Sequence, residues 1–127
     1  MRFLAMVKSA ENSGPPPQEL MNAIAKLGEE ATKAGTLIET GGLYQSAAGA
    51  RVRLSGGKIT VIDGPFTEAK EVIGGYAIYD LKSKQEAIEA TTRFIELHKK
   101  HWPGWEGESE IRQIFDGSDF VADARNR

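Results

Sequence analysis

The run Val72-Ile73-Gly74-Gly75-Tyr76-Ala77-Ile78-Tyr79-Asp80-Leu81 decides the fold of this chain. Its alternating positions are apolar on both sides, which is typical of a strand in the middle of a sheet, covered on both faces. The pair Gly74-Gly75 interrupts the side chains and predicts a β-bulge or a close backbone approach.

Elements on either side of this strand complete the pattern. Apolar residues recur at helical spacing over residues 18–34, and Gly35 follows as the residue after the helix end. A second helix is expected from Ser83 to about residue 100, because Ser83 and Glu86 have capping-box spacing. The remaining apolar runs predict strands over residues 2–7, 37–40, 51–54, 58–62 and 108–115.

Gly56-Gly57 joins two of these strands and predicts a tight hairpin. The element order is then strand, helix, strand, hairpin, strand, helix, strand. It predicts an α+β fold of the ferredoxin-like split βαβ type with an added β-hairpin. Two helices would cover one face of an antiparallel sheet. A second copy of the chain is the economical cover for the other face, so we expect a homodimer.

With 127 residues, the chain has the length of one domain. We expect this domain over residues 1–116 and a polar tail over residues 117–127. Net charge is -2 without a concentrated basic face, which argues against a nucleic-acid partner. The absence of cysteine excludes disulfides and cysteine nucleophiles and fits a cytoplasmic location. No apolar stretch has the length of a membrane span, so we expect no membrane association.

Asp63-Gly64-Pro65-Phe66-Thr67-Glu68-Ala69-Lys70-Glu71, followed by Gly74-Gly75-Tyr76, resembles the signature of the DGPF branch of the YCII-related family. Three further segments fit the family pattern: Met1-Arg2-Phe3, residues 37–43 and Glu110-Ile111-Arg112. The resemblance covers nearly the whole chain and implies a dimeric α+β barrel of the ferredoxin-like type.

The resemblance implies little about a reaction. The branch with better-argued chemistry is thought to pair an Asp with a His in the first helix, but this chain has no His before His98. Some DGPF members are encoded beside extracytoplasmic-function sigma factors. That association implies a protein partner in sigma-factor regulation.

The signature loop holds the first group of candidate residues. Asp63 is favoured as a turn residue, and the alternative is a catalytic carboxylate at the end of a strand, facing a cleft. Phe66, Glu68 and Lys70 are candidate ligand contacts, although loop charges are usually only solvated and Phe66 suits a core plug. Tyr76 could serve a pocket with its hydroxyl, with packing as the favoured role.

The end of the second helix holds the second group. His98 and His101 are the only histidines, and histidine titrates near neutrality, so His101 is the candidate acid–base group. Trp105 is a candidate aromatic wall for a small ligand. A metal would need about three ligands, which His98, His101 and Glu108 supply only if they converge, so we expect no metal and no other cofactor.

Arg112 is the last candidate ligand contact. A charge on an edge strand that discourages aggregation is the default explanation. A clamp for a phosphate or carboxylate group is the alternative, and it requires two arginines to meet.

Three functions fit these features. The first is a dimeric binding or regulatory module for a small molecule or a protein, favoured by the missing first-helix His and the lack of a nucleophile. The second is a cofactor-independent acid–base enzyme with a cleft between sheet and helices, which rests on fold analogy. The third is a protein-interaction dimer without a ligand.

Overall fold

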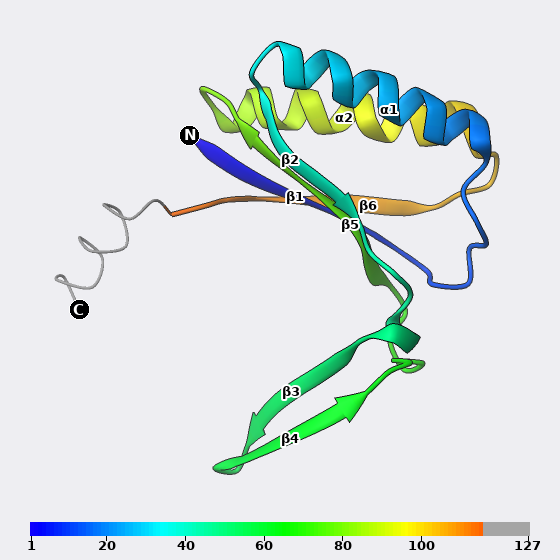
Figure 1. Ribbon diagram of the computed structural model, residues 1–127, viewed down its shortest axis with the longest axis vertical. Coiled ribbons are helices and arrows are strands. Elements are labelled where there is room, and N and C mark those ends of the chain that lie inside the picture. The colour runs from blue at the N-terminus through cyan, green and yellow to red at the C-terminus, as the bar shows by residue number, and fades with distance from the viewer. Residues whose placement is uncertain (116–127) are drawn as a thin grey trace, which may run out of the picture.

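The computed structural model describes residues 1–115, so the predicted tail over 117–127 lies outside the described residues. Figure 1 shows the elements in chain order. They are β1 (Arg2–Ser9), α1 (Gln18–Lys33), β2 (Leu37–Gly42), the 3₁₀ helix η1 (Ser46–Ala48), β3 (Ala50–Ser55), β4 (Lys58–Asp63), β5 (Val72–Asp80), α2 (Lys84–His101) and β6 (Gly107–Gln113).

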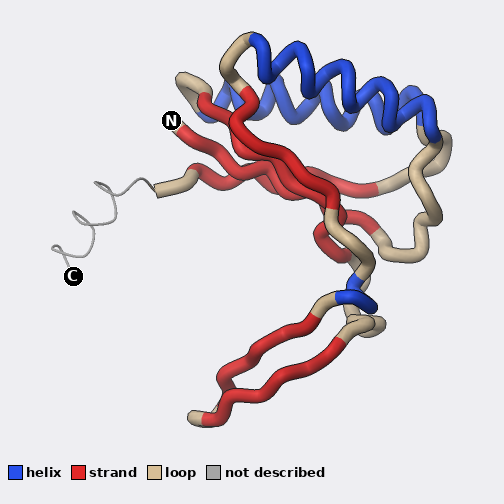
Figure 2. The backbone as a smooth tube through the Cα atoms, in the orientation of Figure 1, coloured by secondary structure: helices blue, strands red, loops and turns tan. Residues whose placement is uncertain are grey.

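Four strands form an antiparallel sheet in the order β2-β5-β1-β6. Strand β5 pairs on both sides, as its two apolar sides predicted. Helices α1 and α2 lie together over one face of this sheet, and the other face carries no helix among residues 1–115 (Figures 1 and 2). The predicted α+β class, the antiparallel sheet and the two helices are confirmed.

Strands β3 and β4 form a separate two-stranded hairpin that projects from the sheet on the side away from the helices (Figure 1). Gly56 and Gly57 form its turn with φ of 58° and 75°, as the glycine pair predicted. Val52 lies opposite Val61, and the next apolar pair toward the turn is Leu54 and Ile59. All four side chains are 67–72% exposed.

Local signals set the helix ends. Gly35 has φ of 77° after α1, and the N–H groups of Gly35 and Thr36 donate to the carbonyls of Thr32 and Ala31, which is the Schellman arrangement. At the start of α2, the Ser83 hydroxyl accepts a hydrogen bond from the N–H of Glu86. Both ends fall within one residue of the positions expected from sequence.

The core lies between the sheet and the helices. Phe3 and Ala5 of β1 are 2% and 5% exposed, and Ala5 packs with Tyr79 of β5 and Ala90 of α2. The register between β1 and β5 shifts so that Gly74 is left without a partner, which confirms the predicted bulge.

The face of the sheet away from the helices is partly apolar. Side chains alternate along a strand, so the residues next to Phe3 and Ala5 point to this open face. They are Leu4 and Met6, and their partners on β5 are Ile78 and Tyr76. This stripe, Leu4, Met6, Tyr76 and Ile78, is hereafter the open-face stripe.

Candidate functional site

A cavity of about 600 Å³ lies between the two helices and the sheet. Leu20, Ile24 and Leu27 line it from α1. The sheet contributes mostly small residues, Ala5, Gly75 and Ala77. Their short side chains leave space under the helices that a close-packed core would normally fill.

Two buried hydroxyl groups in the cavity lining have no hydrogen-bond partner within residues 1–115. They are Thr91 Oγ1 on α2 and Ser109 Oγ on β6, and the Thr91 residue is only 6% exposed. Leaving a buried hydroxyl unpaired costs about 1–3 kcal/mol of stability. Both residues belong to the cavity lining, and each carries a buried hydroxyl group that the described chain leaves unpaired.

His98 lines the same cavity and is 5% exposed. Its Nδ1 lies 3.0 Å from the carbonyl oxygen of Phe94, and a carbonyl can only accept, so Nδ1 carries the hydrogen. Nε2 of the neutral ring is then a hydrogen-bond acceptor. Burial lowers the pKa of His98 and outweighs the opposing effect of the Phe94 hydrogen bond, which favours this neutral form.

An aromatic cluster surrounds His98. Its ring centroid lies 4.5 Å from that of Trp105, 4.7 Å from that of Phe94 and 6.5 Å from that of Trp102. A turn at Gly104, where the N–H of Trp105 donates to the carbonyl of Trp102, folds the chain back after α2. The Trp105 ring therefore packs against His98, and His101 is not part of this cluster.

The structure does not bring the two predicted catalytic residues together. Asp63 is exposed at the end of β4, on the hairpin side of the sheet. His101 is on the last turn of α2, on the helix side, with Nδ1 3.9 Å from Glu19 Oε2. Neither residue lines the cavity, and no hydrogen bond or ion pair joins them in the described part of the chain.

The predicted contacts Phe66 and Glu68 brace the base of the hairpin. The guanidinium of Arg51 lies 3.9 Å from the centroid of the Phe66 ring and forms an ion pair with Glu68. This hydrogen-bonded pair lowers the pKa of the Glu68 carboxyl. Lys70 is exposed nearby. The geometry therefore gives Phe66 and Glu68 a structural role outside the cavity, whereas Lys70 forms no hydrogen bond or ion pair within residues 1–115.

Glu11 ties the β1–α1 loop to the base of the hairpin at the edge of the cavity. Its two carboxylate oxygens accept hydrogen bonds from the N–H and the hydroxyl of Ser46, at 2.5 and 2.6 Å. The Ser46 hydroxyl also accepts from the N–H of Phe66 at 3.0 Å. The bonds from Ser46 lower the pKa of Glu11, which keeps its carboxylate ionised and occupied.

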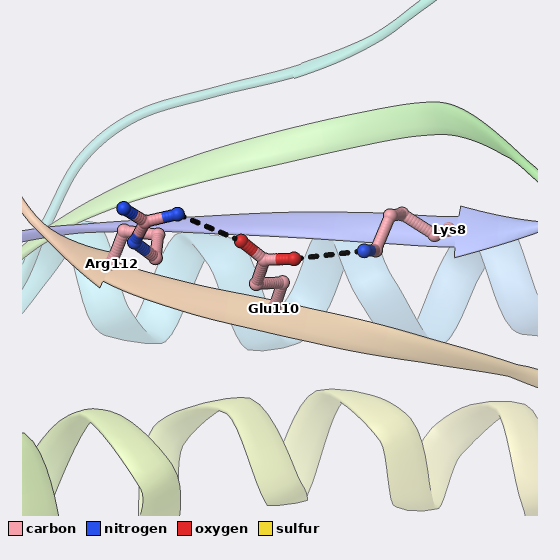
Figure 3. Close-up of polar contacts among 3 residues, drawn as sticks. All are labelled: Lys8, Glu110 and Arg112. Carbon is pink, nitrogen blue, oxygen red and sulfur yellow. Dashed lines mark hydrogen bonds and ion pairs between the residues drawn. The ribbon is translucent and has the colours of Figure 1, made fainter.

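Arg112 and Tyr76 both lie on the open face of the sheet. Arg112 pairs with Glu110 at 3.3 Å, and Lys8 Nζ lies 2.8 Å from the other carboxylate oxygen (Figure 3). No second arginine joins this group within residues 1–115, so the geometry does not form a two-arginine clamp. The Tyr76 hydroxyl donates to Glu39 at 3.1 Å, which raises its pKa.

Of the candidate residues predicted from sequence, Trp105 lines the cavity. Tyr76 borders it on β5, but its hydroxyl is bonded to Glu39 on the open face of the sheet. Three polar residues of the lining, Thr91, His98 and Ser109, are not among these candidates, and His98 is named from sequence only as a possible metal ligand. A signal for two of these existed, because Thr91 and His98 lie on the apolar stripe of the second helix. Buried polar side chains need hydrogen-bond partners, so a polar residue on the buried side of a helix indicates a candidate binding site.

Two further properties concern the whole described segment. Within residues 1–115, no three His, Asp or Glu side chains are grouped closely enough to hold a metal ion. Neither helix in this segment is both long and apolar enough to cross a membrane.

The sequence is similar to a known protein family and to a curated protein. Residues 1–95 match the model of the YCII-related domain, a segment that includes the signature loop and ends within α2. An uncharacterized protein of Rhizobium meliloti (strain 1021) is 32% identical over 72 residues, 57% of this chain. The match spans 58% of that relative's length. On the family match, the chain belongs to the YCII-related domain family.

Proposed function

We propose that this protein is a binding or regulatory module that holds a small molecule in the cavity between its helices and its sheet. The two buried, unpaired hydroxyl groups of Thr91 and Ser109 carry the proposal. A volume of about 600 Å³ falls within the range of small-molecule sites, roughly 300–1,000 Å³. The proposed location is the cytoplasm, because a chain without cysteine needs no oxidising compartment for disulfide formation.

Replacing Thr91 with valine tests whether its hydroxyl is kept for a ligand. Valine has nearly the same shape and lacks the unpaired group, so we expect the free protein to gain about 1 kcal/mol in unfolding free energy. Urea denaturation at one protein concentration measures this gain. Such a gain would mean that the threonine is retained at a cost in stability, as functional groups often are.

Thr92→Val is the matched control. Thr92 lies next to Thr91 on α2 but is exposed, and its hydroxyl donates to the carbonyl of Ile88 at 2.7 Å. We expect a change within about 0.5 kcal/mol for this surface position. A Thr91→Val protein less stable than wild type by about 1 kcal/mol would show that Thr91 has a structural partner, contrary to the proposal.

We further propose that two copies join through the open faces of their sheets, as a dimeric α+β barrel of the ferredoxin-like type in the DGPF branch. The strand order β2-β5-β1-β6 supports the ferredoxin-like topology. The open-face stripe points to the side of the sheet without helices. The hairpin projects on that side and carries four exposed apolar side chains, which supports a partner there (Figure 1). The family association with extracytoplasmic-function sigma factors supports a protein partner in sigma-factor regulation for this dimer.

Sedimentation velocity tests the dimer. At micromolar concentration, we expect a species with twice the mass of the chain, and we expect Ile78→Glu to convert it to a monomer because a charge would be buried in the interface. Ile88→Glu on α2, where Ile88 is 38% exposed, should leave the dimer intact. A wild-type monomer would rule out the dimer without affecting the ligand site.

A further inference from the structure

We infer that the ligand of the cavity is an uncharged, mainly apolar molecule with a hydroxyl group, and that this hydroxyl donates its hydrogen to Nε2 of His98. The inference rests on the proposed function, because it specifies the chemistry of the same site. It follows from three properties of the lining: its lack of free charge, the orientation of His98, and its aromatic surface.

The described lining offers no charge to bind an ionic ligand. It contains no lysine and no arginine, and Glu11 is its one permanently charged side chain. Both carboxylate oxygens of Glu11 are already bonded to Ser46. A phosphate or carboxylate group would therefore enter a largely apolar space without a cation, which is strongly unfavourable.

The hydrogen-bonding groups favour a hydroxyl. Nε2 of His98 is an acceptor, because Nδ1 uses its hydrogen on the Phe94 carbonyl. In the part of the chain that the structure describes, no hydrogen bond to Nε2 is formed. A ligand hydroxyl has one hydrogen to donate to Nε2 and lone pairs that can accept from the hydroxyls of Thr91 or Ser109. An ether or a ketone lacks that hydrogen.

The rest of the lining fits an apolar body. Leu20, Ile24 and Leu27 cover the cavity from α1, and Phe94 and the two tryptophans surround His98. Apolar surface buried here contributes about 25 cal/mol per Å². The body of the ligand supplies affinity through this burial, and the single hydroxyl supplies orientation.

Three probes of similar size separate these properties: 4-propylphenol, 4-propylanisole and 4-propylbenzoate. The first has the hydroxyl, the second has it methylated, and the third is an anion. Trp102 and Trp105 are the two tryptophans of the chain and both line the cavity, so selectively excited tryptophan fluorescence reports binding. We expect the phenol to bind about tenfold more tightly than the anisole, and the benzoate more weakly than either.

His98→Phe tests the acceptor while keeping an aromatic ring in the cluster. We expect this variant to bind the phenol and the anisole with equal affinity, with anisole binding unchanged from wild type. If this variant does not fold, ¹⁵N NMR of the wild-type imidazoles replaces it. The Nε2 resonance of His98 should then shift with the phenol and not with the anisole, while His101 serves as the internal control.

The outcomes separate the two proposals. Equal affinity of wild type for phenol and anisole, or tighter binding of the benzoate, would overturn the inferred ligand class and leave the cavity as a binding site. If none of the three probes changes the tryptophan fluorescence, both the ligand class and the cavity as a small-molecule site are overturned. A preference for the phenol that survives in His98→Phe would reject His98 as the acceptor.

Discussion

Gly64→Ala is expected to destabilise the protein by more than about 3 kcal/mol. A Cβ atom at this position would overlap the carbonyl oxygen of Ser46 and lie 2.6 Å from its carbonyl carbon. Both are backbone atoms, so no side-chain rotation relieves the overlap. Ser46 is held in place by Glu11, and its hydroxyl also binds the N–H of Phe66, so moving it would break those bonds as well.

Gly74→Ala provides the matched comparison for this prediction. Gly74 is also in the segment around the signature loop, but a Cβ there would meet nothing within 4 Å. We expect its unfolding free energy to stay within about 0.5 kcal/mol of wild type, as measured by urea denaturation. A Gly64→Ala protein as stable as Gly74→Ala would mean that η1 does not pack against the end of the hairpin as described.

Phe3→Ala is expected to lower the unfolding free energy by about 3–5 kcal/mol. The Phe3 side chain is 2% exposed in the central strand β1, where it lies opposite Tyr79. Its removal would lose apolar burial and would leave a void in the core. The midpoint of urea unfolding, with an unchanged slope, measures the loss.

The same substitution at Phe115 is the control. Phe115 is 68% exposed, so Phe115→Ala removes as many atoms with little lost burial, and we expect a change within about 0.5 kcal/mol. Equal destabilisation by the two substitutions would contradict the placement of Phe3 in the core.

The strands and helices could be predicted because their signals are local. The apolar run at 72–81, the turn glycines Gly56-Gly57 and the cap at Ser83 each determine one element, and each element was found within one or two residues of the expected position. The final strand ends at Gln113, two residues earlier than expected, because its pairing with β1 ends at Phe3. Short η1 was not predicted, since its sequence Ser46–Ala48 has no helical period.

The site could not be predicted in the same way, because it depends on distances between elements. Small residues such as Ala5 and Ala77 fit a strand equally well above a filled core and above a cavity. Asp63 is the alternative catalytic carboxylate because it follows a strand in the signature loop, and His101 is a candidate because histidine titrates near neutrality. Neither property indicates which way a residue faces. His98 has the same chemistry as His101 and lies in the cavity, three residues earlier on the same helix.

The hairpin β3–β4 has a further consequence for the freshly made chain. This ribbon presents Val52, Leu54, Ile59 and Val61 as an exposed surface rich in β-branched residues, of the kind that nucleates aggregates. Its opposite side carries Arg51, Arg53 and Lys58 at alternating positions. Arg51 is paired with Glu68, but Arg53 and Lys58 form no ion pair within residues 1–115. These two cations repel the ribbons of neighbouring chains and act as gatekeepers, so the alternation that exposes the apolar surface also limits misassembly during synthesis.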